Sequence, residues 1–366
     1  MIRKSLLAAL LLLPTAGWSQ QDSGLLERFE SLGIREAATP LRDQPGWAPP
    51  RRIAVALPRR VADAEARVRQ LAGDIEVTFI SSGLPDPGEI DVFVGWCFPA
   101  ALAPGSSVRY LHNYGSGLDR CSFDANARSA DVIVTNGQKV ASEMIGEHAI
   151  AMAFALARNL PVFSRAMSQG DWNRALTAEP QVTSLRGKVM LVLGLGGIGT
   201  QVARMASNLG MRVVATRNSR REGPDFVDYV GLSHEMSYLA RGADVVVNAL
   251  PLTRDTRGAV NGEFFGEMKP GAYYISVGRG GTTDTDALLD ALNSGRLRGA
   301  GLDVTDPEPL PADHPLWQAP NVIITPHVSG ASDQQVSLSF ELAMENLGRY
   351  IRGDRLLNVV DLKRGY

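Results

Sequence analysis

Residues 189–200 read VMLVLGLGGIGT, and the rest of the chain can be organised around them. Their first part, Val189–Leu193, is wholly apolar, which is typical of a strand buried on both faces of a parallel sheet. The pattern G-x-G-x-x-G follows at once at Gly194, Gly196 and Gly199, and a helix-like segment comes after it. A strand, a glycine turn and a helix in this order are typical of dinucleotide binding.

Each glycine of this turn has a separate task in such a site. Gly194 permits the tight turn, Gly196 lets a pyrophosphate approach the backbone, and Gly199 lets the helix pack closely on the strand. The unpaired N–H groups at the start of the helix, at Gly197 and Ile198, would then face the phosphates. A tight turn that binds nothing is the alternative interpretation.

The end of the next strand indicates which dinucleotide would bind. An acidic residue about 20 positions beyond the turn would bind the ribose hydroxyl of NAD. Here Arg217 occupies that place, Ser219 and Arg220 follow, and no acid occurs before Glu222. Guanidinium groups make charge-assisted bonds with phosphate oxygens, so the sequence favours NADP(H). A solvated basic loop that also tolerates NAD(H) is the alternative.

Two groups of strand-like segments alternate with helix-like ones along the chain, and such alternation predicts parallel βαβ units. We therefore predict two doubly wound α/β domains with parallel sheets. A flavodoxin-like substrate domain would comprise residues 52–141 and 329–366, and a Rossmann-type dinucleotide domain residues 142–328. The expected strands are Ile53–Leu57, Ile75–Ile80, Ile90–Trp96, Val108–Tyr114, Val132–Thr135, Val189–Leu193, Arg212–Ala215, Val245–Asn248, Tyr273–Val277, Gly301–Val304 and Val322–Thr325.

The composition excludes several classes of partner and site. The 366 residues carry 37 basic and 39 acidic side chains, a formal net charge of −2. This balance gives no electrostatic reason to expect nucleic acid or an acidic membrane as a partner. The 2 cysteines cannot form a disulfide scaffold or a four-cysteine zinc site, and the histidines lack ligand-like spacing, so we predict no metal.

The N-terminus has a pattern of its own. A basic start and the apolar run Leu6–Leu13 precede small residues, which is the pattern of a secretory signal peptide. The run is too short to span a bilayer, and no other segment approaches that length. We predict a signal peptide at residues 1–19, cleaved after Ser19, and an exported protein that is periplasmic in a bacterium. A buried N-terminal helix in a cytoplasmic protein is the alternative, and residues 20–51 are expected to form an irregular arm.

Several motifs together point to a known family. They are YGSGLD from Tyr114, LRGK from Leu185, the glycine turn, LPLT from Leu250, VGRG from Val277, GLDV from Gly301, PEPLP from Pro307 and TPH from Thr325. With these motifs the chain resembles the D-isomer-specific 2-hydroxyacid dehydrogenases, and most closely their glyoxylate/hydroxypyruvate reductase A type. The resemblance covers roughly residues 52–361. It implies a homodimer, and it leaves the leader and arm without a counterpart.

Three residues have the chemistry that reducing a 2-keto acid needs. Arg279 and His327 each follow an apolar run, so both are expected at the carboxyl edge of the sheet, where open α/β sheets bind ligands. A guanidinium can hold a carboxylate in two places, and an imidazole suits proton transfer near neutrality. Glu308 would keep that imidazole protonated and oriented. The resemblance assigns the same roles to Arg279, His327 and Glu308, although each residue seen alone has an ordinary structural alternative.

The resemblance also implies less specific residue assignments around the cofactor and the substrate. Asp303 would hydrogen-bond to the nicotinamide amide, with a structural turn as the alternative. The substrate carboxylate would be held by the backbone N–H groups of Ser116 and Gly117. Trp96 and Tyr114 end two expected strands and would line the substrate pocket, with core packing as the alternative. The remaining implied cofactor contacts are Leu250 and Pro251, and a structural role is expected for His148.

The sequence therefore predicts an NADPH-dependent reductase that converts a small 2-keto acid, such as glyoxylate or hydroxypyruvate, to the D-2-hydroxy acid. A NAD(P)-binding sensor or regulatory protein of the same fold, with little turnover, is the alternative. Export would bring the protein to an oxidising compartment. There Cys97 and Cys121, which follow neighbouring expected strands, could pair, although two unpaired thiols are favoured.

Overall fold

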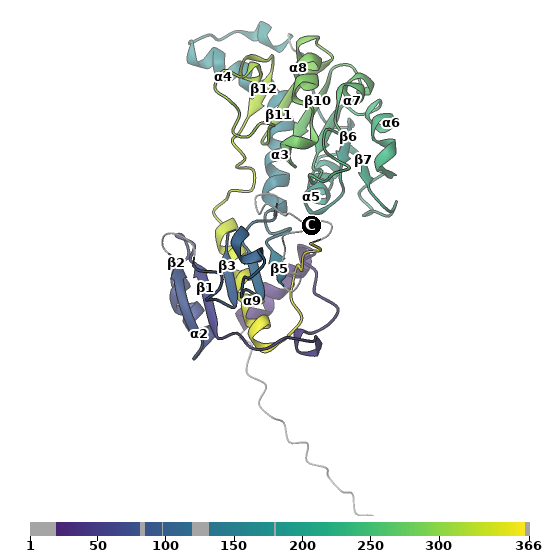
Figure 1. Cartoon of the computed structure of the whole chain (residues 1–366). Helices are drawn as coiled ribbons and strands as arrows, with labels where there is room; N and C mark the ends of the chain where they lie inside the picture. The colour runs from purple at the N-terminus through teal and green to yellow at the C-terminus, as the bar shows by residue number, and fades with distance from the viewer. Residues whose placement is uncertain (1–19, 81–84, 97, 119–131, 179–180, 363–366) are drawn as a thin grey trace, which may run out of the picture.

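The computed structural model describes residues 20–80, 85–96, 98–118, 132–178 and 181–362. Their strands form one sheet of five and one of seven, and every pair of neighbouring strands within these sheets is parallel. The two sheets lie in separate lobes (Figure 1). The predicted fold class, two doubly wound parallel-sheet domains, is confirmed.

The five-stranded sheet has the order β2-β1-β3-β4-β5, which is the flavodoxin-like order. Its strands are β1 (Arg52–Ala56), β2 (Glu76–Ile80), β3 (Val92–Gly95), β4 (Tyr110–Asn113) and β5 (Ile133–Asn136). Helices α2 (Ala64–Ala72) and α9 (Gln335–Arg352) share one apolar core with this sheet. Within that core the rings of Tyr110 and Tyr350 stack with centroids 4.5 Å apart. Gly353, in the left-handed conformation at φ 72°, ends α9.

The seven-stranded sheet has the order β12-β11-β10-β9-β6-β7-β8. Its strands are β6 (Val189–Leu193), β7 (Arg212–Arg217), β8 (Tyr229–Leu232), β9 (Val245–Asn248), β10 (Ala272–Ser276), β11 (Leu297–Leu302) and β12 (Val322–Ile324). Without the added β12, this is the 3-2-1-4-5-6 order of a Rossmann domain. Helices α3 (Ser142–Ala157) and α5 (Gly197–Asn208) bury one face of the sheet. The other face is covered by α6 (Met236–Ala240), α7 (Gly262–Glu267) and α8 (Thr285–Asn293).

The chain crosses twice between the lobes (Figure 1). It leaves the five-stranded sheet after β5 and enters α3, and it returns after β12 to reach α9. Paired crossings of this kind permit domain closure over a ligand. The carboxyl edge of the seven-stranded sheet is the part of the fold that matters for the site described below.

The expectation of an irregular arm at residues 20–51 is wrong for its first part. Residues Gln20–Ser31 form helix α1. Phe29, only 2% exposed, packs in a cluster with Val140, Leu342 and Leu357. A helix this short is stabilised mainly by tertiary packing, and the sequence does not display the partners of Phe29.

Two strand predictions also need correction. The strand before Asp303 is Leu297–Leu302 rather than Gly301–Val304, because it begins in LRGAGL, where two glycines resemble a turn. One of them, Gly299, is required by packing, since a Cβ there would lie 2.5 Å from Nδ2 of Asn321. The edge strand β8 was not expected, because Tyr229–Leu232 is short and contains a glycine.

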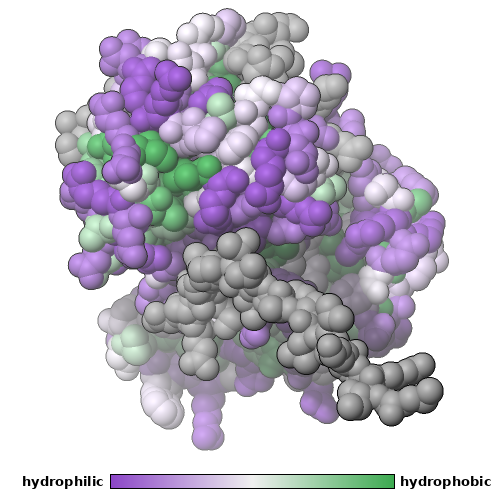
Figure 2. All heavy atoms as spheres, turned by 90° about the horizontal axis from the view of Figure 1, so that it is seen from below, coloured by the Kyte–Doolittle hydropathy of each residue, from purple (hydrophilic) through white to green (hydrophobic). Residues whose placement is uncertain are grey.

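The face of the molecule seen from below is mostly hydrophilic where it is not covered by grey atoms (Figure 2). Among the described residues, no helix combines the length and apolar character needed to cross a membrane.

Candidate active site

The candidate residues follow one another along a single edge of the seven-stranded sheet. His327 comes after β12, Asp303 after β11 and Arg279 after β10, and these three strands are neighbours. The same edge continues with Leu250 after β9, the glycine turn after β6 and Arg217 at the end of β7. Parallel strands bring all their carboxyl ends to one edge, where ligands of such sheets bind. The sheet order thus places the predicted catalytic residues beside the predicted cofactor residues.

The glycine turn fits a dinucleotide. Gly194 is in the left-handed conformation at φ 88°, and its N–H donates to Oγ1 of Thr216 at 3.3 Å. A Cβ at Gly199 would lie 2.1 Å from the carbonyl oxygen of Gly194, so only glycine lets α5 approach β6 this closely. A Cβ at Gly196 would meet no heavy atom within 4 Å. The backbone of Gly196 therefore faces open space, as a pyrophosphate requires.

The basic turn after β7 has a donor without a partner. Arg217 is half-buried, and its Nε is buried with no hydrogen-bond acceptor. Burial, followed by the charge of Arg220, lowers the pKa of Arg217. Ser219 and Arg220 are exposed, whereas Arg221 is occupied by an ion pair with Glu235 at 2.8 Å. The turn therefore offers cationic groups for an anion and a buried N–H still to be satisfied.

The structure brings His327 and Glu308 together. Nδ1 of His327 lies 2.7 Å from Oε1 of Glu308, and about a third of each side chain is exposed. A carboxylate can only accept a hydrogen bond, so Nδ1 carries the hydrogen and Nε2 remains for another partner. His327 also has a left-handed backbone, at φ 54°, which a residue with a Cβ rarely adopts. Strain of this kind is often found at functional sites.

Asp303 holds the segment that carries His327. Its Oδ1 accepts hydrogen bonds from Oγ1 of Thr325 at 2.7 Å and from N of Val328 at 2.9 Å, and its Oδ2 accepts one from N of Ser329 at 3.0 Å. The backbone oxygen of Asp303 accepts from N of His327 at 2.8 Å. Burial alone would raise the pKa of this carboxyl, but the hydrogen bonds from Ser329, Thr325 and Val328 outweigh it and lower the pKa. These bonds agree with the structural alternative for Asp303, although the sequence did not show which groups it holds. Contact with a nicotinamide amide stays a prediction.

His148 on α3 extends this network. Its Nε2 lies 3.0 Å from Oγ1 of Thr325. Because the hydroxyl hydrogen of Thr325 goes to Asp303, Nε2 of His148 donates in this contact. His148 thus connects the helix that leaves the substrate domain to the segment carrying His327.

The turn that carries Arg279 is pressed against the loop after β11. A Cβ at Gly280 would overlap the carbonyl oxygen of Thr305, at 1.8 Å, so this position requires glycine. Buried Asn248 donates to Oγ1 of Thr282 at 2.8 Å, and that hydroxyl donates to the carbonyl oxygen of Arg279 at 2.7 Å. The backbone of Arg279 is therefore fixed from β9, while its Nη1 donates to the carbonyl oxygen of Gly278 at 2.9 Å.

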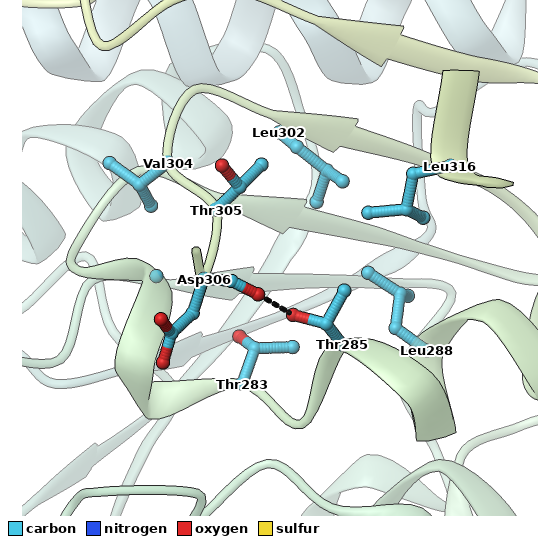
Figure 3. Close-up of a pocket in the computed structure, with 9 residues that line it drawn as sticks. Thr283, Thr285, Leu288, Leu302, Val304, Thr305, Asp306 and Leu316 are labelled. Carbon is cyan, nitrogen blue, oxygen red and sulfur yellow. Dashed lines mark hydrogen bonds between the residues drawn. The ribbon is translucent and has the colours of Figure 1, made fainter. Parts of the chain in front are cut away.

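The loop leading to Glu308 has a further support (Figure 3). Oγ1 of Thr285, at the start of α8, donates to the carbonyl oxygen of Asp306 at 2.7 Å. The cavity drawn around this bond has a volume of about 10 Å³, enough for about one water molecule and no organic ligand. It belongs to the scaffold of the loop and not to the candidate site.

The predicted substrate loop of the other domain is braced through its carbonyl groups. Nδ2 of Asn113 donates to the oxygens of Gly115 at 3.0 Å and Gly117 at 3.1 Å. Nδ2 of Asn136 donates to the oxygen of Ser116 at 2.7 Å. The two buried asparagines were not among the predicted site residues, and the only sequence signal for them is their place at the ends of β4 and β5. This bracing fixes the orientation of the peptides whose N–H groups are predicted to hold a carboxylate.

Trp96 and Tyr114 lie against each other beside this loop. Their ring centroids are 5.9 Å apart, with a near-perpendicular arrangement. Trp96 is 62% exposed, whereas Tyr114 is 4% exposed and its buried hydroxyl has no hydrogen-bond partner. Core packing thus explains most of Tyr114, and Trp96 is the one that can meet a ligand.

Some predictions fall outside the described residues. These are the signal peptide at residues 1–19 and both cysteines, Cys97 and Cys121. Within the described ranges, no three His, Cys, Asp or Glu side chains are grouped so that they could hold a metal ion.

Comparison with known proteins gives the family. The sequence profile of the D-isomer specific 2-hydroxyacid dehydrogenase NAD binding domain matches residues 150–329. The chain is 32% identical over 280 residues to a glyoxylate reductase of Korarchaeum cryptofilum, which covers 76% of this chain and 81% of that protein. It is 41% identical over 181 residues to an uncharacterized protein of Corynebacterium melassecola, and spans 59% of the length of that relative.

Among solved structures, a D-isomer specific 2-hydroxyacid dehydrogenase from Xanthobacter autotrophicus Py2 in complex with NADPH and MES is similar, with a TM-score of 0.72 and 27% identity. The match covers 87% of this chain and 100% of that one. The resemblance inferred from the motifs is thus confirmed for the family, while the A-type assignment within it stays a prediction. The chain belongs to the D-isomer specific 2-hydroxyacid dehydrogenases, a family of NAD(P)-dependent oxidoreductases.

Proposed function

We propose that this protein reduces a small 2-keto acid of the glyoxylate or hydroxypyruvate class to the D-2-hydroxy acid, with NADPH as the cofactor. The observation that carries the proposal is the 2.7 Å contact between His327 and Glu308, on the sheet edge that also carries Arg279. The glyoxylate reductase named among the relatives supports the same substrate class.

Each residue has a defined task in this proposal. The guanidinium of Arg279 holds the substrate carboxylate and polarises the neighbouring keto group, and the N–H groups of Ser116 and Gly117 bind the same carboxylate from the other domain. Nε2 of His327 gives its proton to the oxygen of the forming alcohol. Glu308 stabilises the imidazolium before that transfer and keeps the ring oriented. The bound cofactor supplies the hydride, and the glycine turn, Arg217 and the edge at Leu250 and Pro251 would hold it.

A steady-state assay of NADPH oxidation tests this proposal. Glyoxylate and hydroxypyruvate should be reduced by the purified protein, and the product of hydroxypyruvate should be the D-isomer in a chiral separation. Glu308→Gln keeps the size of the side chain but removes its charge, so kcat should fall about 10²-fold or more while NADPH binding is retained. Turnover by Glu308→Gln equal to that of the unchanged protein would contradict the acid/base pair, and NADPH binding without any turnover would favour the sensor function.

We also propose export, because residues 1–19 have the pattern of a signal peptide. Cell fractionation with mass spectrometry of the N-terminus tests it. A mature protein that begins at Gln20 outside the inner membrane supports export, whereas intact Met1 in the cytosol refutes it. An intact-mass measurement with and without reductant tests the pairing of Cys97 with Cys121.

A homodimer is the third part of the proposal. Helix α4 (Leu160–Ser168) and the segment after it expose large apolar side chains: Leu160 at 54%, Met167 at 76% and Trp172 at 93%. Large exposed apolar side chains are typical of interaction surfaces where they form one patch, and all three lie within 13 residues of the chain. Light scattering should give twice the mass of one chain, and Trp172→Glu should lower it; a monomer at micromolar concentration would refute the proposal.

A further inference from the structure

A lysine side chain spans the gap between the glycine turn and the N-terminal arm. Lys139 lies between β5 and α3. A Cβ at Gly197, the first residue of α5, would be 3.0 Å from Cγ of Lys139. A Cβ at Gly33 of the arm would be 3.2 Å from Nζ of the same lysine. The ammonium group therefore sits beside the arm, while its stem passes the residue whose N–H is predicted to face the cofactor phosphates.

The arm places a second cation at this point. Arg35, two residues beyond Gly33, is exposed, and its backbone is clamped by one asparagine. N of Arg35 donates to Oδ1 of Asn358 at 3.3 Å, and N of Asn358 donates to the carbonyl oxygen of Arg35 at 2.7 Å. Nδ2 of Asn358 donates to the carbonyl oxygen of Gln138 at 2.7 Å. Arg35 is thus fixed next to the loop that carries Lys139.

The charges of this cluster affect one another across the two domains. Burial lowers the pKa of Lys139, and the charge of Arg35 lowers it further. Burial and then the charge of Arg220 lower the pKa of Arg217, Glu222 acts in the opposite direction, and Arg35 is a further, smaller lowering cause. The contacts give the same placement: Lys139 passes Gly197 of the glycine turn, and Gly194 of that turn donates to Oγ1 of Thr216, the residue before Arg217. In the described part of the chain, Arg35, Lys139 and Arg217 have no carboxylate at ion-pair distance.

We propose that Arg35 and Lys139 complete the phosphate site of the cofactor, with Arg35 as a specificity-determining residue for the 2′-phosphate of NADP(H). This inference rests on the proposed function. Arg35 faces the 2′-phosphate together with Arg217, and Lys139 faces the pyrophosphate beside Gly197. Each anion is then held by groups from both domains, so binding relieves a repulsion between cations and draws the arm toward the dinucleotide domain. The arm, which precedes the segment that resembles other dehydrogenases, acquires a role in cofactor choice.

Binding measurements test the two cations separately. Isothermal titration calorimetry with NADP⁺, NAD⁺, adenosine 2′,5′-bisphosphate and 5′-AMP would be compared for the unchanged protein, Arg35→Gln, Lys139→Gln and Arg51→Gln. Arg35→Gln should weaken the two 2′-phosphorylated ligands about tenfold, roughly the effect of one lost charge-assisted contact, and change the other two less than twofold. Lys139→Gln should weaken NADP⁺ and NAD⁺ by similar factors. Arg51→Gln removes the same charge from an exposed residue at the amino end of β1 and should change none of them.

The outcomes distinguish this inference from the function on which it rests. If the unchanged protein binds NADP⁺ and reduces glyoxylate, but Arg35→Gln binds all four ligands normally, the inference fails and the function stands. A loss shared equally by NADP⁺ and NAD⁺ in Arg35→Gln would also overturn the assignment of Arg35 to the 2′-phosphate. If the unchanged protein binds NAD⁺ more tightly than NADP⁺, both the cofactor choice and the inference fail.

Discussion

Replacing Asp303 by asparagine tests whether this buried carboxylate positions His327, the proposed proton donor. Asp303 is 1% exposed and accepts hydrogen bonds from Thr325, Val328 and Ser329, which flank His327 on both sides. Asparagine has nearly the same shape but offers one acceptor oxygen in place of two. At least one of the three donors would then face an NH₂ group.

The expected loss in the free energy of unfolding follows from these hydrogen bonds. One buried donor without an acceptor costs about 1–3 kcal/mol, and two further bonds change from charged to neutral acceptors at about 1 kcal/mol each. The easier burial of a neutral amide offsets part of this loss. We expect Asp303→Asn to lower the free energy of unfolding by about 3 kcal/mol and to loosen the segment of His327. A misplacement of about 1 Å can cost about 10²-fold in rate, so kcat should fall by that order.

The assay compares kcat, KM and cofactor binding in Asp303→Asn and Thr325→Val. The second variant removes one donor to Asp303 and leaves the carboxylate charged. If Asp303 acts by positioning, both variants lower kcat, Thr325→Val by the smaller factor. KM for the keto acid should change little, because Arg279 is fixed from β9 through Asn248 and Thr282.

A different pattern would refute this reasoning. Should Asp303 serve only a nicotinamide amide, Asp303→Asn would weaken cofactor binding at unchanged kcat, and Thr325→Val would behave like the unchanged protein. Unchanged stability of Asp303→Asn in urea unfolding would likewise contradict the anchoring role.

Three further predictions concern other parts of the molecule. His327→Ala should lower kcat by about 10²–10⁴-fold with NADPH affinity retained in a binding assay, and an unchanged kcat would end the acid/base assignment. Arg217→Asp should shift the ratio of kcat/KM values toward NADH, because it replaces a phosphate clamp by a ribose acceptor; preference for NADH before the change would contradict it. Burial lowers the pKa of His112 to about 3, so the unfolded chain binds a proton below about pH 6.5 that the folded chain does not. His112 should therefore contribute a loss of stability from pH 6.5 downward of about 1.4 kcal/mol per pH unit, and His112→Gln should reduce the slope seen in urea unfolding by that amount; an equal slope in that variant would refute the assignment.

The order of the site residues along the sheet edge could be predicted from the sequence. Arg279 and His327 each follow an apolar run, and in a parallel sheet every such run delivers its next residue to the same edge. The glycine turn was also predictable, because the motif assigns close packing of helix and strand to Gly199. The structure leaves no room for a Cβ at that position. Hydrophobic periodicity and turn chemistry are local properties of the sequence, and they were sufficient to predict the sheet-edge residues and the glycine turn.

Helix α1 and the cluster around Lys139 could not be predicted in this way. Phe29 is buried by Val140, more than 100 positions away in the sequence, and by residues of α9 and the segment after it, more than 300 positions away. The arm that carries Arg35 is joined to the loop of Lys139 through Asn358, which hydrogen-bonds to Arg35 and to Gln138. Contacts of this kind depend on the path by which the chain returns to its first domain. Local sequence patterns do not predict that path.

The groups that position the proposed catalytic residues were harder to recognise in the sequence than the proposed catalytic residues themselves. Gly280 was recognised only as part of the VGRG motif, whereas the structure gives the reason for glycine there, because the carbonyl oxygen of Thr305 occupies the place of a Cβ. Asn248 reads as the end of a buried strand, yet it fixes the turn of Arg279 through Thr282. Both act on a neighbouring strand end rather than on a ligand. Reactive side chains can be recognised in a sequence, because their reactivity belongs to the residue type. The groups that position them cannot, because that role depends on which strand ends become neighbours in the fold.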